Sequence, residues 1–402
     1  MAEQKALKVF IASNVGMDYF FFLGKTLAVN GTQVEPIFLV SEQDYRFAAK
    51  KKGLKKIYLR IQMYIFYPIL LIYKAITSPK NSVFIVTSNT FFAPVLAKFF
   101  VSWRKTKVIH LLYDLYPDAI EIAGAIKQNG LLAKAIGKIT KANFKHCNGT
   151  VYLGDFLKSH AEARWCKPHS SDVIHISTDL SMYDNEFPEL SVDGKIIIHY
   201  GGQLGHLHDA SSIVKCIKYL FESDLKNQFE FNFYLSGAQA QFLEESLKGY
   251  PIKIIPAVNS SVWRQDIKNY HIGLVTLLPG GATVCLPSKT YGMMAGGLAI
   301  LAICPVWSDL GTLVLENNAG WVVNNAAYDT IDFAALNYLQ QIKELKPIDK
   351  MQEDFYETLK SIASHKEVLK EKRSNAFNCV RNKYNASLLN SQWISCLNDS
   401  KA

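Results

Sequence analysis

Residues 195–209, KIIIHYGGQLGHLHD, decide the fold. The apolar run at 195–200 predicts a strand, the glycines at 201–205 a turn, and a helix is predicted from about 209 to 223. Strand, turn and helix in this order form the repeating unit of a parallel α/β sheet. The glycines let backbone amides approach an anion, and the helix N-terminus adds a favourable dipole. Glycines are equally expected at any tight strand-to-helix turn, and GGxxG is not the full dinucleotide fingerprint.

The same alternation extends in both directions from this stretch. Before it, strands are predicted at 7–13, 32–40, 82–88, 107–114, 149–154 and 172–177; after it, at 231–237, 252–258, 272–278, 298–304 and 320–324. Helical stretches such as 90–103 and 130–146 lie between them.

A polar stretch with proline and glycine, 179–195, interrupts the alternation, and 402 residues exceed the usual size of one hydrophobic core. We therefore expect an α/β chain of two doubly wound, Rossmann-like domains facing a cleft, with ligands at the carboxyl ends of the strands. The predicted parts are an N-terminal domain at 1–185, a second domain at 193–350 and a helical tail at 351–402.

Composition indicates an ordinary globular chain, with 49% hydrophobic and 20% charged residues. Seven cysteines without a CxxC pair disfavour a zinc site and a disulfide framework. The N-terminus passes at once into a predicted strand without a targeting pattern, so we expect a cytoplasmic protein.

The net charge of +9 favours an anionic partner. Residues 46–60, RFAAKKKGLKKIYLR, contain seven basic residues and no acid, and the apolar run 61–76 follows. That run is expected to be too short for a membrane span of about 20 residues and to be interrupted by Pro68. Two interpretations of 46–76 stay open: peripheral contact with an anionic membrane, or a solvated basic loop before a core helix. No recognised nucleic-acid-binding motif accompanies the charge, which disfavours nucleic acid.

A second stretch, VCLPSKTYGMMAGGLAILA (284–302), predicts a ligand loop leading into a short helix. Pro287 fits the start of the helix, and Gly296 with Gly297 fits its end. Ser288 and Lys289 then place a hydroxyl, a cation and free backbone amides where a diphosphate can bind. The alternative is an exposed lysine on a short core helix.

PSKTYGMMAGG (287–297) and YGGQLGHLHD (200–209) together resemble the nucleotide-sugar domain of family 4 glycosyltransferases of the GT-B fold, in their bacterial polysaccharide branch. SDLGTLVLENNAGWVV (308–323), YDLYPDA (113–119) and VIHISTDLSMY (173–183) are similar to further elements of that branch. The resemblance covers about residues 6–325.

The resemblance implies that a sugar moves, with retention and without a metal or cofactor, from a nucleoside diphosphate sugar to a saccharide or lipid-linked saccharide acceptor. The implied setting is surface polysaccharide synthesis at the cytoplasmic membrane face. The chain has no D-x-D triplet. Many family members carry two glutamates with seven residues between them, and these positions here are Val284 and Gly292. This departure motivates the alternative of a catalytically inactive nucleotide-sugar or saccharide-binding partner of another transferase.

Two residues are the catalytic candidates. Lys289 would neutralise the leaving diphosphate. Asp114 ends a predicted strand and would accept a proton from the acceptor hydroxyl or orient it; a cap ahead of Pro117 is the alternative. On the donor side the candidates are the loop residues Gly202, Gln203, Leu204 and Gly205, Val258 for the base, Gly280 and Gly281 for the sugar, Ser288 and Thr290 for the phosphates, and Asp309 for the ribose. On the acceptor side they are Gly16 and Asp118.

Overall fold

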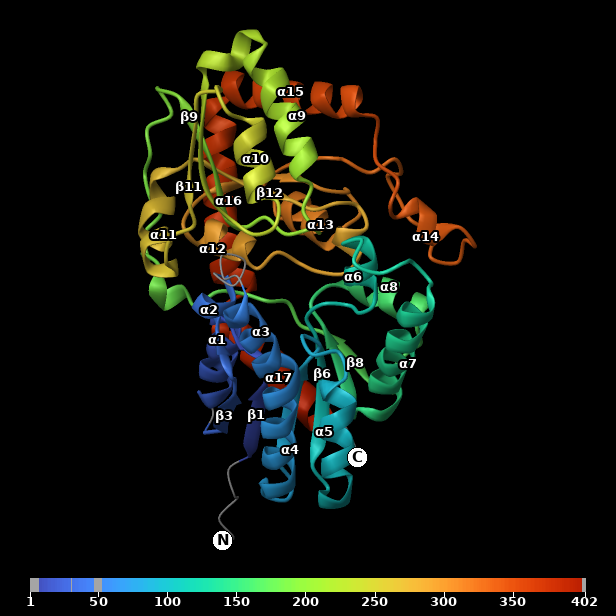
Figure 1. The fold of residues 1–402 in the computed structure, drawn as a ribbon. Coiled ribbons are helices and arrows are strands. Elements are labelled where there is room, and N and C mark those ends of the chain that lie inside the picture. Colours follow the sequence, from blue (N-terminus) through green and yellow to red (C-terminus); the bar gives the residue numbers. More distant parts are fainter. Residues whose placement is uncertain (1–6, 30, 47–52, 400–402) are drawn as a thin grey trace. The chain divides into compact units, whose positions relative to one another are not determined.

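The computed structural model describes residues 7–29, 31–46 and 53–399 and divides the chain into two compact units (Figure 1). The first unit comprises residues 1–176 together with 386–402, and the second comprises 177–385. The division at 176 falls before the predicted polar linker, so residues 177–185 belong to the second unit. The predicted helical tail is shared between the two units.

The first unit contains a six-stranded parallel sheet. Its order is β3 (Gln33–Ile37), β1 (Lys8–Ala12), β5 (Val83–Thr87), β6 (Lys107–Leu112), β7 (Gly149–Tyr152) and β8 (Ser171–Val173). A separate parallel pair joins β2 (Val15–Gly16) to β4 (Val40–Ser41). Its helices are α1 (Asp18–Ala28), α2 (Glu42–Arg46), α3 (Leu54–Ile61), the π-helix η2 (Gln62–Phe66), α4 (Tyr67–Thr77), α5 (Ala93–Val101), η3 (Ser102–Arg104), α6 (Asp118–Ile122), α7 (Leu131–His146), α8 (Asp155–Arg164) and α17 (Ala386–Asp399).

Helices cover both faces of this sheet. Phe10 and Phe84 of neighbouring strands stack at 4.5 Å and belong to the same core cluster as buried residues of α4 and α5. Ile11 points to the opposite face, where a Cβ added at Gly24 of α1 would lie 3.7 Å from its side chain. Alternate side chains of one strand thus enter two cores, as a doubly wound sheet requires.

The prediction that Pro68 interrupts the helix at 61–76 was wrong. Residues 54–77 form one continuous helix through α3, η2 and α4. At its centre the Tyr67 N–H donates to the Gln62 carbonyl, five residues back, which is the π-helical pattern. Proline has no N–H to donate and clashes with the preceding turn, and we attribute its tolerance to this wider turn.

The second unit contains a six-stranded parallel sheet in the Rossmann order. The order is β11 (Ile252–Pro256), β10 (Phe229–Ser236), β9 (Ile196–Gln203), β12 (Ile272–Thr276), β13 (Ala299–Ile303) and β14 (Gly320–Val323). Its α-helices are α9 (Ala210–Phe221), α10 (Ala240–Ser246), α11 (Ser260–Asp266), α12 (Lys289–Ala295), α13 (Asp309–Glu316), α14 (Tyr338–Gln341), α15 (Ile348–Ser364) and α16 (Lys366–Lys383). Short 3₁₀ turns are η4 (Leu180–Met182), η5 (Asp224–Asn227), η6 (Ile267–Asn269) and η7 (Gly281–Thr283).

The chain order of this sheet reverses between β9 and β12. Such a switch point leaves a crevice at the carboxyl ends of the two strands, because their connections leave in opposite directions. The loop that follows β9, and the loop that follows β12 with the start of α12, carry most of the predicted donor residues. Val258 instead follows β11, and Asp309 begins α13. The fold therefore brings together two stretches that lie about 80 residues apart in the sequence.

The C-terminal helices divide between the units. Buried residues of α15, including Phe355 and Leu359, share a core cluster with β9 and β10 of the second unit. In contrast, α17 packs on α1 of the first unit, where the Asn390 amide donates to the Thr26 carbonyl and Trp393 is buried.

A substitution at Gly320 tests how closely β14 packs against β13 in the second sheet. A Cβ at this position would lie 1.8 Å from the Ile300 carbonyl oxygen and 2.7 Å from the Ile300 nitrogen, and both belong to the rigid backbone of β13. We expect Gly320→Ala to lower the unfolding free energy by about 3 kcal/mol or to prevent folding. Thermal unfolding followed by circular dichroism measures the effect. Gly194→Ala is the control, since nothing lies within 4 Å of its added Cβ, and equal melting temperatures of the two variants would contradict the packing described.

Candidate functional site

The loops after β9 and β12 lie side by side in the second unit. The Leu278 N–H donates to the Leu207 carbonyl at 2.9 Å, and a Cβ added at Gly281 would lie 2.4 Å from the same oxygen. The Gln239 side-chain amide donates to the carbonyls of Gly205 and His208 at 2.6 and 2.9 Å. These hydrogen bonds fix the loop that follows β9. Gly281 is thus needed for close backbone approach, and its predicted contact with sugar hydroxyls stays a prediction.

Lys289 reaches the first of these loops from α12. Its Nζ lies 3.7 Å from the centroid of the Tyr200 ring and 3.5 Å from the Gln203 carbonyl oxygen. A cation over an aromatic face is attracted by the ring quadrupole, which holds the ammonium at this place. A Cβ added at Gly202, whose φ of +100° suits glycine, would lie 4.0 Å from the lysine side chain. The structure therefore brings together Gly202, Gln203 and Lys289, as the sequence predicts.

Two imidazoles near Lys289 are held neutral. Burial, with a contribution from the Lys289 charge, lowers the pKa of His208 to about 3 and that of His199 to about 4. At neutral pH neither ring adds positive charge, and Lys289 supplies it at this loop. His206 is exposed beside them.

The N-terminus of the helix that follows the first loop is capped by a side chain of the protein itself. Helix α9 begins only at Ala210, and its N-cap Asp209 accepts a hydrogen bond from the Ser212 N–H. Asp209 also accepts from Ser212 Oγ and from the Asn325 amide. This carboxylate caps the N-terminus of α9, so the contribution of that dipole to anion binding stays a prediction.

The remaining donor candidates differ in accessibility. Ser288 is the exposed N-cap of α12, and its hydroxyl makes no capping hydrogen bond. Leu204, Gly280 and Thr290 are buried, so the side chains of Leu204 and Thr290 form part of the packing around the loops. Val258 follows β11 and Asp309 begins α13, and both are half-buried.

The sequence did not predict that Trp263 lies beside the donor candidates of α12. Trp263 of α11 lies against Gly292, the second position at which the wider family has a glutamate: a Cβ there would be 3.0 Å from the indole and 2.8 Å from the Tyr183 hydroxyl. A tryptophan in the polar segment SSVWRQD carries no pattern that marks a site, so only the fold identifies it.

In the first unit, Asp114 follows β6 at the carboxyl edge of the sheet. The N–H groups of Tyr113 and Asp114 both donate to Ser88 Oγ, at 2.9 and 3.0 Å, and hold the turn after β6 to the end of β5. Burial raises the pKa of the Asp114 carboxyl to about 6. A carboxyl that titrates near neutral pH is suited to exchanging a proton with a hydroxyl.

Polar side chains from the ends of β1 and β5 lie at the same edge. The Asn14 amide donates to the Asn89 carbonyl, and the Asn89 amide to Ser13 Oγ, each at 3.3 Å. Among the described residues, the side-chain oxygens of Asn14 and Asn89 are buried without a hydrogen-bond partner. Gly16, an acceptor-side candidate, instead makes room for packing, since a Cβ there would meet Phe38 at 2.9 Å.

Asp118 lies in a buried network rather than at an open surface. Its carboxylate is 2.9 Å from His160 Nε2 and accepts from Arg164 at 2.6 Å and from the Trp165 indole at 3.0 Å. His160 and Arg164 lower its pKa despite its full burial. These contacts, all from α8 and the residue that follows it, fix α6 in place, so we assign Asp118 a structural role.

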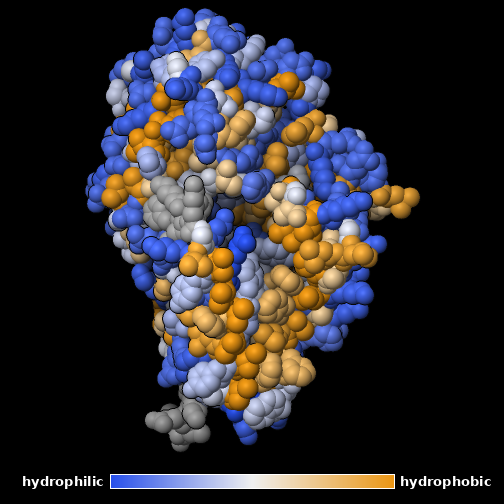
Figure 2. Space-filling view, in the orientation of Figure 1, coloured by the Kyte–Doolittle hydropathy of each residue, from blue (hydrophilic) through white to orange (hydrophobic). Residues whose placement is uncertain are grey.

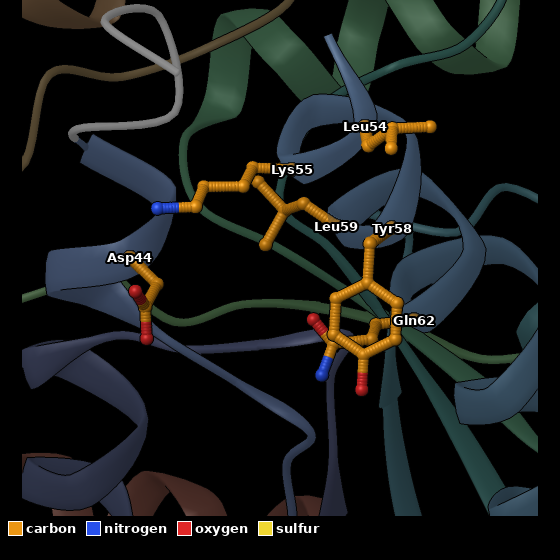
Figure 3. Close-up of a pocket in the computed structure, with 6 residues that line it drawn as sticks. All are labelled: Asp44, Leu54, Lys55, Tyr58, Leu59 and Gln62. Atoms are coloured by element: carbon orange, nitrogen blue, oxygen red, sulfur yellow. The ribbon is translucent and has the colours of Figure 1, made fainter. Parts of the chain in front are cut away.

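A pocket of about 410 Å³ opens between α2 and α3 (Figure 3). It is lined by Asp44, Leu54, Lys55, Tyr58, Leu59 and Gln62. The next residue of α2, Tyr45, has its pKa raised to about 12 by burial and by the charge of Asp114.

Comparison with known proteins identifies the fold. No family model matches the chain. The probable glycosyltransferase WbjE of Pseudomonas aeruginosa is 22% identical over 233 residues, and this match spans 54% of the chain and only 55% of WbjE. The structure of WaaG, a glycosyltransferase involved in lipopolysaccharide biosynthesis, aligns with a TM-score of 0.63 at 9% identity over 98% of this chain and 100% of its own. HepE of Anabaena in complex with UDP aligns with a TM-score of 0.61 at 10% identity over 98% and 99%. The chain has the GT-B fold, as predicted.

Because the pKa of Asp114 is raised, replacing its carboxyl by a neutral amide should increase the free energy of unfolding. The unfolded carboxyl ionises near pH 3.9 and the folded one near 6, so ionisation favours the unfolded chain as pH rises between these values. We expect Asp114→Asn to be more stable than wild type by about 2 kcal/mol at about pH 7.5, with a smaller difference at about pH 4.5. Differential scanning calorimetry at the two pH values measures this.

Asp118→Asn is the matched control for Asp114→Asn. Because the folded pKa of Asp118 is lowered, its charge contributes stability above the unfolded pKa that is lost as pH falls. Removing this paired, buried charge should destabilise the first unit by about 3 kcal/mol at about pH 7.5. Equal shifts in the two variants would contradict the environments assigned to these carboxyls.

Proposed function

We propose that this chain is a glycosyltransferase that transfers a sugar, with retention, from a nucleoside diphosphate sugar to a saccharide or lipid-linked saccharide acceptor. The observation that carries the proposal is Lys289, held on Tyr200 over the Gln203 carbonyl at the switch point of the second sheet. When the bond between sugar and diphosphate breaks, negative charge grows on the leaving phosphate. The diphosphate is already anionic in the donor, and a fixed ammonium beside a glycine loop stabilises the additional charge of the transition state more than the smaller charge of the ground state.

The proposed acceptor side uses Asp114. Its carboxyl is held at the carboxyl edge of the first sheet and titrates near neutral pH, so it can accept a hydrogen bond or a proton from an acceptor hydroxyl. The partly unsatisfied amides of Asn14 and Asn89 at the same edge offer hydrogen bonds of the kind that a saccharide requires.

The comparisons support this assignment of substrates. WbjE is described as a probable glycosyltransferase, and the HepE structure contains UDP. We propose the same donor class for this chain, in bacterial surface polysaccharide synthesis at the cytoplasmic membrane face.

We also propose that the first unit docks on the membrane surface through the helix 54–77. By length and composition this helix is apolar enough to cross a membrane, so the prediction that the apolar run is too short for a span was wrong. A third of the most apolar window of the helix is nevertheless buried within the protein. Its buried residues Leu59, Met63, Tyr67, Leu71 and Ala75 recur at four-residue intervals and, with buried Pro68, attach the helix to the unit. A helix held along one side lies on a bilayer more readily than it crosses one.

The opposite side of this helix is exposed and apolar. Ile65, Ile69 and Tyr73 are between 52 and 60% exposed, and Phe99 and Trp103 of the neighbouring α5 and η3 are 72 and 65% exposed. Figure 2 shows hydrophobic side chains gathered over α4 and α5. Exposed Lys55, Lys56 and Arg60 precede them, and cations beside an apolar strip match an anionic headgroup layer. Residues 47–52 of the basic run lie outside the described residues.

Lys289 provides the test of the donor site. Wild type should be stabilised against heat by one or more of UDP, GDP, ADP and dTDP, since a ligand that binds only the folded state raises its stability. We expect Lys289→Ala to keep its fold, to bind that nucleotide at least tenfold more weakly and to lose sugar transfer. The measurements are thermal shift and product formation by mass spectrometry.

Lys268→Ala is the control, because this lysine is on the same unit and exposed with only a surface ion pair to Asp184. Full turnover by Lys289→Ala would refute the role of Lys289. Nucleotide binding without transfer over a broad acceptor panel would instead favour the inactive-partner alternative.

Vesicle sedimentation tests the membrane proposal. Wild type should bind vesicles of phosphatidylcholine with phosphatidylglycerol. Ile65→Gln with Ile69→Gln should weaken binding about 100-fold, because burial of each of the two apolar side chains contributes about 1.5 kcal/mol. The control is Leu131→Gln with Leu132→Gln, which changes exposed leucines on α7. Failure of wild type to bind, or equal loss in both variants, would count against docking through this helix.

A further inference from the structure

Trp263 occupies a gap between β9 and α12 that two glycines leave open. A Cβ at Gly201 would lie 2.3 Å from the indole nitrogen, and a Cβ at Gly292 would lie 3.0 Å from the far edge of the ring. The indole therefore extends from the end of β9 to α12. Any larger residue at either position would displace it, while part of the Trp263 side chain stays exposed to solvent.

A hydrogen-bond relay fixes the orientation of this ring. The Trp263 indole N–H donates to His199 Nε2 at 2.9 Å, and His199 Nδ1 lies 2.7 Å from the Asn232 carbonyl oxygen. The network assigns the proton to Nδ1, so His199 is neutral and accepts through Nε2. The imidazole also stacks on Tyr270 with a centroid distance of 4.6 Å and an interplanar angle of 16°.

The ring packs against the helix that carries the cation of the donor site. Gly292 is one helical turn after Lys289 on α12, and Gly201 precedes Gln203 on β9 by two residues. The loop with Val258 leads directly into α11, which carries Trp263. A fixed cation at the start of α12 and a fixed aromatic ring against Gly292 of the same helix match the two ends of a nucleoside diphosphate. The ammonium would contact its phosphates and the ring its base or ribose.

We propose that the Trp263 indole contacts the nucleoside of the bound donor and that His199 is the positioning residue that holds the ring. The inference rests on the proposed function and deepens it. In this chain Val284 and Gly292 stand at the two positions where many family members have a glutamate, so neither position offers a carboxylate to the ribose. The Trp263 indole would supply a nucleoside contact in their place. The space next to Gly292 is filled by the indole and by the Tyr183 hydroxyl.

Comparing UDP with inorganic pyrophosphate separates the nucleoside contact from the phosphate contact. Affinities are measured by isothermal titration for wild type, Trp263→Leu, Trp263→Phe and Lys289→Ala, with GDP, ADP and dTDP run in parallel. We expect Trp263→Leu to weaken binding of the preferred nucleotide about tenfold without changing pyrophosphate affinity, because base stacking on an aromatic ring contributes about 1–3 kcal/mol. Trp263→Phe should keep most of the affinity, and Lys289→Ala should weaken both ligands.

Intrinsic fluorescence gives an independent readout. The chain has six tryptophans, and UDP or the preferred nucleotide should quench wild type but not Trp263→Phe. Trp103→Phe is the control, because Trp103 belongs to the first unit and is 65% exposed. Quenching should survive that change.

His199 is tested by rescue. His199→Phe removes the acceptor of the indole N–H and should weaken nucleotide binding in the same direction as Trp263→Leu. His199→Gln keeps an acceptor oxygen and should recover most of the affinity.

The outcomes separate the two proposals. Nucleotide affinity within twofold of wild type in Trp263→Leu, or equal loss of UDP and pyrophosphate binding, would overturn the role of Trp263 and leave the function standing. Equal affinities of His199→Phe and His199→Gln would overturn the positioning role. If no nucleotide binds wild type, the proposed function itself fails.

Discussion

The hydrogen bond from the Leu278 N–H to the Leu207 carbonyl is the constraint on which the second unit's candidate site depends. It joins the loops that leave β9 and β12 at the point where the strand order reverses. Gly281 permits this approach because any Cβ would collide with the same carbonyl. With the loops joined, α12 starts where Lys289 can reach Tyr200 and Gln203. The cation is therefore positioned by backbone packing, which is more rigid than a long side chain could be by itself.

The two candidate sites use polar groups in opposite ways. Around Lys289 the imidazoles of His199 and His208 are neutral, so the lysine supplies positive charge beside a glycine loop where these rings add none. At the edge of the first sheet, Asp114 is a carboxyl whose charged form is disfavoured by burial. A fixed charge favours binding of an anion, while a carboxyl near its pKa favours exchange of a proton. The chemistry assigned to each unit follows from this difference.

The sequence predicted the framework well because alternation and turn residues are local signals. All twelve predicted sheet strands are present, and the helix after Pro287 begins and ends where its proline and glycines indicated. Pro68 was misread because a π-turn that accommodates proline leaves no mark in the sequence. Asp118 and Trp263 depend on partners about 40 and 60 residues away in the chain, His160 and His199, and only the fold shows that those partners are close.

Helix α17 makes the first unit discontinuous in the chain. Trp393 and Asn390 pack with that unit although residues 177–385 form the other one. The second unit is thus an insertion, and the surface of α1 that α17 covers stays unfilled until residues 386–399 have been synthesised. On the ribosome, which makes about 5–20 residues per second, the second unit can fold first although its sequence comes later than most of the first. The first unit is complete only when α17 packs on α1, and such a contact between distant parts of the chain forms slowly relative to local structure.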